Sequence, residues 1–307
     1  MRASKYYISL IYLSFFSFIV FAIPHGVDWQ AYSSIYVNFE RFYFLREPLG
    51  WLVSIAFRDF DNGNTAAALL IGLMLITSSA FILHSDRRMS FVVGFPVLFL
   101  LVFSNFFLLL SVNGLRQGLA LSFLLFSLGF LMRDKVFFSI LFFIAAVASH
   151  NSALLFLVVL FSYRFPAKFF VNTGLLLLIP LAPFINKISG KSSQLSVNNN
   201  TLEFTVVIVF LLIIMIFFRF LNRNVVSLNN LYAMLGVFSI SIAFIQINSV
   251  YERIVYYTIP VAVLLVAICL SHIKNEYVIF FVLFFFALLN FFYSLTHPSV
   301  IGNFYNL

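Results

Sequence analysis

Long apolar runs divided by short basic segments constrain the fold of this chain more than any other feature. A run such as Phe204–Phe220 has no polar–apolar alternation, and its length matches the roughly 17–25 residues that cross a bilayer as one helix. Hydrophobic residues make up 63% of the 307 residues and charged residues only 9%, so a soluble chain could not cover this much apolar surface. The sequence therefore predicts an all-α, polytopic membrane protein.

The apolar runs predict about 11 transmembrane helices in a single polytopic membrane domain that covers residues 1–307. The expected spans are Tyr6–Ile23, Thr65–Leu83, Phe91–Ser111, Leu115–Met132, Val136–His150, Ser152–Tyr163, Phe169–Ile185, Phe204–Phe220, Asn229–Ile247, Ile254–Ser271 and Tyr277–Leu295. The first run is long and lacks a cleavage site, so it is interpreted as an uncleaved helix. We also expect a long outer loop at 24–64 with an interfacial helix at Pro48–Phe57, and a mobile outer loop at 186–201.

The basic residues set the expected orientation. With the N-terminus in the cytoplasm and the C-terminus outside, every inside segment carries at least one basic residue, for example Arg87, Arg133, Lys168, Arg219 and Lys274. The net charge of +8 therefore indicates membrane topology, and we expect no nucleic-acid partner. A single Cys269 gives no disulfide framework and no metal signature.

One interval is too short for two ordinary spans. Only about thirty residues separate Arg133 from Arg164, whereas two spans need roughly forty. The basic residues at both ends favour two short helices that meet below the outer surface, rather than one long span. His150 and Asn151 would then lie at a sunken hairpin tip, where polar backbone is tolerated beside a protein-lined or wet cavity. We therefore predict a cavity that opens to the outside.

Two ionisable residues lie between apolar runs at a common depth. Arg116 precedes Arg133 by seventeen residues, and His150 follows Lys135 by fifteen. At the helical rise, both stand about 22–26 Å from the cytoplasmic end. A central Arg costs about +2.5 to +3.5 kcal/mol to insert, so such residues are interpreted as functional. Snorkelling of Arg116 and a structural hydrogen bond of His150 are the alternatives.

The other unusual charged residues also fall on the outer side, namely Asp28, Glu47 and Arg253. Arginines bind phosphate oxygens through a planar fork, and a His or carboxylate can take a proton from an attacking hydroxyl. The pattern favours an anionic, lipid-linked substrate. Solvated loop charges and an Arg253–Glu252 pair are the alternatives. The aromatic residues nearby could stack on sugars or anchor the interface: Trp29, Tyr32 and Trp51.

These motifs resemble a known family. Asn113-x-x-Arg116-Gln117-x-x-Ala120 followed by His150-Asn151-Ser152-Ala153 is similar to the EpsG-like branch of the Wzy-type O-antigen and exopolysaccharide polymerases. Further motifs stand where that family has them, namely Gly26-x-Asp28-Trp29-x-x-Tyr32, Glu47-Pro48 and Arg253-x-x-x-Tyr257.

The resemblance implies a GT-C-like, metal-independent glycosyltransferase without a cofactor. Such an enzyme joins undecaprenyl-diphosphate-linked oligosaccharide repeat units in the bacterial inner (cytoplasmic) membrane, with its active site facing the periplasm. His150, Asp28 and Glu47 would be the catalytic candidates. The substrate- or diphosphate-binding candidates would be Arg116, Gln117, Arg253, Tyr257, Asn113, Trp29 and Tyr32. Membrane lipid and a chain-length regulator protein are the expected partners.

Other functions use similar groups. A polyprenyl-linked glycosyltransferase or ligase differs only in its acceptor. A lipid-linked oligosaccharide flippase would place polar residues through the midplane and often has internal repeats, neither of which is evident. A membrane acyltransferase would explain a lone histidine but not two outer arginines.

Overall fold

The computed structural model describes residues 47–57, 63–85, 91–102, 104, 110, 115–164, 199–221, 226–245, 248–272, 277, 279–281 and 283–285. Every regular element in these ranges is a helix, and none of their residues lies in a strand. The predicted all-α fold is confirmed over this part of the chain. The chain divides into two compact units, Met1–Ala153 with Lys274–Leu307 and Leu154–Ile273. The predicted single membrane domain stays a prediction.

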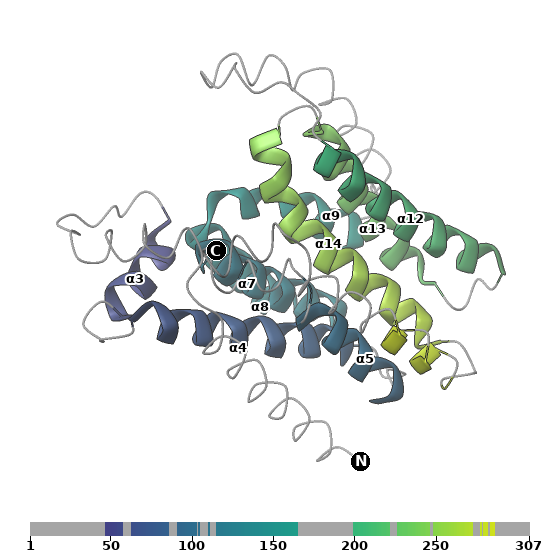
Figure 1. Cartoon of the computed structure of the whole chain (residues 1–307), viewed down its shortest axis with the longest axis horizontal. Helices are drawn as coiled ribbons and strands as arrows, with labels where there is room; N and C mark the ends of the chain where they lie inside the picture. Colours follow the sequence, from purple (N-terminus) through teal and green to yellow (C-terminus); the bar gives the residue numbers. More distant parts are fainter. Residues whose placement is uncertain are drawn as a thin grey trace. The chain divides into compact units, whose positions relative to one another are not determined.

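Helix α7 (Leu115–Met132) is the centre of the first unit. It packs against α4 (Gly63–Leu83) and α8 (Val136–Ser149), and these three helices can be followed in Figure 1. The short α3 (Pro48–Phe57) contacts α4, α7 and α8, and α5 (Phe91–Val102) contacts α4. About 67% of α7 is buried within the protein. Its first turn is thereby held at a fixed place, which matters because Arg116 lies there.

A tight turn reverses the chain between α7 and α8. The backbone N–H of Lys135 donates to the Phe130 oxygen and that of Asp134 to the Leu131 oxygen, at 2.9 and 3.1 Å. Asp134 has φ 59°, in the left-handed region that this helix-ending motif needs and that Asp tolerates. The end of α8 is therefore brought back to the level of the start of α7.

The second unit contains the remaining long helices. It comprises α9 (Leu157–Arg164), α12 (Asn199–Leu221), α13 (Leu228–Ala243) and α14 (Asn248–Leu270). Helix α13 packs on α9 and α14, and α12 packs on α14 and α13. Ser227 begins α13 by accepting a hydrogen bond from the Asn230 N–H at 3.1 Å, which is an ordinary N-cap.

Large apolar side chains remain uncovered on two helices. Only 17% of the Phe204–Leu221 window is buried, although its mean hydropathy is 2.9. One face of α8 is similarly exposed at Phe137, Phe138, Ile140, Leu141 and Ile144. Exposed apolar patches of this size are unusual for a soluble monomer. They are the surfaces that a helical membrane-type protein presents to lipid.

The predicted spans overlap the described helices, but α14 begins at Asn248 rather than Ile254 and α12 at Asn199 rather than Phe204, so both predicted starts were wrong. The bounds predicted for α3 and α7 are those of the structure, and α8 ends one residue early. By length and composition, two described helices could cross a membrane, Leu115–Met132 and Phe204–Leu221, and several shorter apolar helices accompany them. The number of spans and the orientation stay predictions. Tyr6–Ile23 and Phe169–Ile185 lie outside the described residues, as do most of both predicted outer loops.

The segment predicted as one helix at Ser152–Tyr163 differs in detail. It begins as the 3-10 helix η1 (Asn151–Phe156), continues as α9 and ends at Arg164. The helix break predicted at His150 and Asn151 is present, because His150 is extended with φ −157° and ψ 127°. The hairpin predicted for the two helices on either side of this break stays a prediction. Helix α12 begins at Asn199, so the last residues of the loop expected at 186–201 are helical.

Gly50 lets α3 approach the start of α7 and the end of α8 closely. A Cβ added there would lie 2.8 Å from the backbone oxygen of Ser149 and 2.9 Å from Cγ and Cδ of Arg116. Ser149 ends α8 and Arg116 lies in the first turn of α7. The absence of a side chain at Gly50 thus allows three segments to pack closely against one another.

We expect Gly50→Ala to destabilise the protein by about 1–3 kcal/mol, since the opposing Ser149 oxygen belongs to the backbone and cannot rotate away. Thermal unfolding in detergent measures this change. Leu52→Ala is the control on the same helix, because the Leu52 side chain is 48% exposed. Equal melting temperatures for Gly50→Ala and the wild-type protein would contradict the close approach.

Candidate functional site

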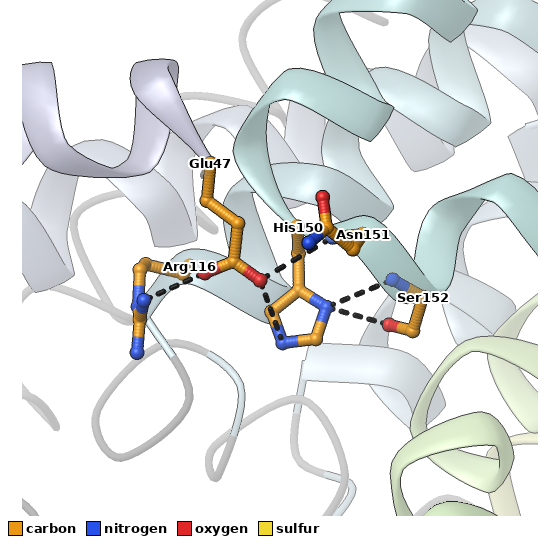
Figure 2. Close-up of polar contacts among 5 residues, drawn as sticks. All are labelled: Glu47, Arg116, His150, Asn151 and Ser152. Carbon is orange, nitrogen blue, oxygen red and sulfur yellow. Dashed lines mark hydrogen bonds and ion pairs between the residues drawn. The ribbon is translucent and has the colours of Figure 1, made fainter. Parts of the chain in front are cut away.

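Three separate segments bring polar side chains together in the first unit. Glu47 directly precedes α3, Arg116 lies in the first turn of α7, and His150 follows α8 (Figure 2). The turn between α7 and α8 explains why Arg116 and His150 share a level, as their spacing predicted. Glu47 bridges them, which the spacing did not predict.

The Glu47 carboxylate is the centre of this group. Its Oε2 lies 2.6 Å from Arg116 Nη1, and its Oε1 accepts the backbone N–H of Asn151 at 3.3 Å. His150 Nε2 lies 3.8 Å from the same Oε1. The Glu47 side chain is only 8% exposed, so it depends on these partners, because a buried carboxylate without them is strongly unfavourable. Glu47 therefore links α3 to both α7 and the end of α8.

Arg116 is bound from two directions. One terminal nitrogen donates to Glu47, and the guanidinium carbon lies 5.0 Å from the centre of the Trp51 ring. Such a cation–π contact fixes the plane of the guanidinium. The side chain is 27% exposed, and Figure 2 shows its second terminal nitrogen directed away from Glu47. Arg116 is thus oriented by protein groups and remains partly exposed.

The backbone around His150 is built for a side-chain contact within the same turn. The helix stops because His150 is extended, and its N–H still donates to the Ala146 oxygen at 3.0 Å. Ser152 then places its hydroxyl 2.6 Å and its backbone N–H 3.3 Å from His150 Nδ1. The His150 side chain is 12% exposed. The imidazole is therefore held between Ser152 and Glu47 (Figure 2).

Glu47 has an unusual backbone conformation. Its φ is 57°, in the left-handed region that residues other than Gly rarely adopt, and the next residue is Pro48. Its carbonyl oxygen accepts the Trp51 N–H at 3.2 Å, so Glu47 also begins α3. Strain of this kind costs of order 1–3 kcal/mol and concentrates at functional sites. The contacts of the carboxylate offset this cost.

The remaining predicted site residues are placed as follows. Gln117 follows Arg116 on α7 and is half-buried. Tyr257 is fully buried on α14 in the second unit, with its ring 5.6 Å from that of Phe156. Arg253 is part of the same helix, one turn before Tyr257, and its side chain lies outside the described residues. Asp28, Trp29, Tyr32 and Asn113 also lie outside them. The roles predicted for all these residues stay predictions.

The sequence did not reveal the contacts of two residues in this network. Trp51, predicted as an interfacial anchor or a sugar platform, packs on Arg116. Its position one helical turn after Glu47 is the signal that could have placed it there. Ser152 belongs to the motif His150-Asn151-Ser152-Ala153, and it contacts His150 directly. Its spacing of two residues from His150 is common for short-range side-chain contacts and carries little information without the structure.

The described residues contain no group of three or more His, Cys, Asp or Glu side chains that could hold a metal ion. What they do contain is a carboxylate, a guanidinium and an imidazole in one contact network. This combination can bind an anion and handle a proton.

Apolar helices around such a network define the class, which is a helical protein of membrane type with an acid–arginine–histidine site. The chain belongs to the EpsG family, whose family model matches residues 5–306. No curated protein and no solved structure matches the chain. The suspected EpsG-like resemblance is confirmed, and the match covers both units.

We expect a double-mutant cycle of Glu47→Gln and Arg116→Gln to give a coupling energy of about 1–3 kcal/mol, because their ion pair is short and largely buried. Denaturant unfolding in detergent supplies the four stabilities.

Glu47→Gln combined with Lys135→Gln is the matched control. Lys135 is exposed and precedes α8, at the end opposite His150, so these two changes should add within about 0.5 kcal/mol. Additive effects for the Glu47 and Arg116 changes would show that the ion pair does not stabilise the fold.

Proposed function

We propose that this chain is a polysaccharide polymerase that joins undecaprenyl-diphosphate-linked repeat units. Membership of the EpsG family supports a function of the polysaccharide-polymerase type. The apolar helices support a membrane location. The proposal places the enzyme in the bacterial inner (cytoplasmic) membrane, with N-in and C-out topology and the Glu47–Arg116–His150 site facing the periplasm.

The observation that carries the proposal is the orientation of Arg116 by Glu47 and Trp51. A guanidinium has five N–H donors in a planar fork, and one terminal nitrogen here serves Glu47. The fork can therefore hold phosphate oxygens with its other donors while the carboxylate keeps it in place. The substrate class that this arrangement fits is a diphosphate at the membrane surface.

In the proposed reaction, a hydroxyl of the acceptor repeat unit attacks the anomeric carbon of the growing glycan. The bond from that carbon to the diphosphate oxygen breaks, and undecaprenyl diphosphate leaves with the bonding electron pair. Arg116, together with Arg253 in the proposal, stabilises the charge on this leaving group. The acceptor proton passes to a carboxylate or imidazole, for which Glu47, His150 and Asp28 are the candidates. No metal is needed in this scheme, because arginines supply the positive charge.

Purified protein with defined lipid-linked repeat units tests the function. Polymer formation and release of undecaprenyl diphosphate in the presence of a chelator are expected. A strict requirement for added divalent metal would contradict the arginine-based scheme. Transfer of a single sugar without polymer would favour a polyprenyl-linked glycosyltransferase or ligase. Movement of the lipid-linked unit across vesicles without a new bond would favour a flippase.

We expect Arg116→Lys to lower polymer formation by about 10²-fold or more, although the charge is kept, because an ammonium cannot serve Glu47 and a diphosphate with a planar fork.

His150→Gln keeps hydrogen-bonding capacity but cannot gain or lose a proton near neutral pH, so a catalytic role predicts a similar loss. The assay is the polymer yield per mole of protein in detergent. Near-normal yield from His150→Gln would leave Glu47 or Asp28 as the base.

The orientation predicts opposite accessibility on the two sides of α12. A cysteine at position 193 should react with an impermeant thiol reagent from outside, and one at position 228 should not. Leu228 suits this test because it is 50% exposed and does not cap a helix, whereas Ser227 caps α13. The native Cys269 is buried and should give little background. Labelling of Leu228→Cys but not of Ser193→Cys would contradict the predicted topology and would indicate that the site faces the cytoplasm.

A further inference from the structure

Ser152 contacts the Nδ1 edge of the His150 ring, which is turned away from Glu47 (Figure 2). Its hydroxyl oxygen lies 2.6 Å from His150 Nδ1, and its backbone nitrogen lies 3.3 Å from the same atom. On the opposite side of the ring, Nε2 lies 3.8 Å from Glu47 Oε1. The two ring nitrogens thus meet different kinds of group.

The backbone contact points to the nitrogen that bears the proton. A backbone N–H can only donate, so its 3.3 Å contact is a hydrogen bond when Nδ1 offers its lone pair and carries no proton. The Ser152 hydroxyl can take either role, and with Nδ1 as an acceptor it donates as well, so the two Ser152 donors share the single lone pair of Nδ1. Neutral imidazole has one N–H, which is therefore on Nε2. This nitrogen lies on the side of the Glu47 carboxylate, 3.8 Å from Oε1, where a protonated nitrogen is favoured over a lone pair although the distance exceeds that of a hydrogen bond.

We propose that Ser152 is a positioning residue that fixes the Nε2-protonated tautomer of His150 and thereby the donor that His150 presents to Glu47. Through Glu47, this contact extends to Arg116, which shares the carboxylate. The order of groups is a hydroxyl, an imidazole, a carboxylate and a guanidinium, with hydrogen bonds at the first and last contacts and a separation of 3.8 Å between imidazole and carboxylate. Ser152 touches no substrate in this scheme.

The consequence for catalysis rests on the proposed function. With Nδ1 occupied by Ser152, neutral His150 presents a protonated Nε2 on the side of Glu47, 3.8 Å from Oε1. Removing the Ser152 hydroxyl removes the shorter of the two Ser152 contacts at Nδ1, and the ring can then rotate or exchange its tautomer. Polymer formation should fall about tenfold, the effect of losing one well-formed hydrogen bond in a site.

The tautomer can be measured without any activity. Histidine labelled with heavy nitrogen allows NMR to distinguish a ring nitrogen that carries a proton from one that does not. His150 is one of five histidines, and its resonances are assigned by their loss in His150→Gln. At a pH where the ring is neutral, the wild-type protein should show the proton on Nε2. A proton on Nδ1 would overturn the proposal with no variant needed.

Three variants connect the tautomer to the reaction. Ser152→Ala should give a mixture of tautomers and the tenfold loss of polymer. Ser152→Thr keeps the hydroxyl, so its tautomer and its polymer yield should match those of the wild-type protein. Ser149→Ala is the matched control, since the Ser149 hydroxyl donates to the Ala145 oxygen at 2.8 Å. It should change neither. An unchanged tautomer and yield in Ser152→Ala would overturn the proposal. A wild-type protein that makes no polymer would refute the proposed function, while the NMR result would still decide the role of Ser152.

Discussion

A buried carboxylate must be surrounded by donors, and this requirement organises the first unit. Glu47 is 8% exposed and finds its donors on two other segments, at Arg116 and Asn151. The close packing at Gly50 and the turn at Asp134 bring these segments within reach. In an apolar surrounding, each such contact is worth more than at a wet surface, and a missing one costs more. The same carboxylate therefore stabilises the fold and orients the site.

The break at His150 shows how an interrupted helix creates a site. Continuing α8 would have satisfied the backbone at residues 150–152 within the helix and left nothing for Glu47. Instead, the Asn151 N–H turns to the carboxylate and the Ser152 N–H to the imidazole. Polar backbone exposed in this way within an apolar protein needs local partners. Here the partners are the side chains that the proposed chemistry uses.

The sequence predicted the helices well because their signal is long and repeated. The bounds of α3 and α7 follow from Pro48 and from the apolar run after Asn113-Gly114, and the break at His150 follows from the short interval to Arg164. The contact between Glu47 and Arg116 could not be predicted, because 69 residues separate them and no local pattern encodes their pairing. The same holds for the left-handed φ of Glu47, a conformation that local propensity disfavours before a proline.

Pairing with a carboxylate weakens the attraction of an arginine for a second anion, but it also fixes the side chain in place. Coulomb attraction to Glu47 fixes one edge of the guanidinium, and Trp51 fixes its face, so little side-chain freedom remains to be lost when a diphosphate binds. The partial neutralisation of Arg116 also keeps the free site close to zero net charge. In the proposed function, a diphosphate would therefore be held by the guanidinium donors that point away from Glu47.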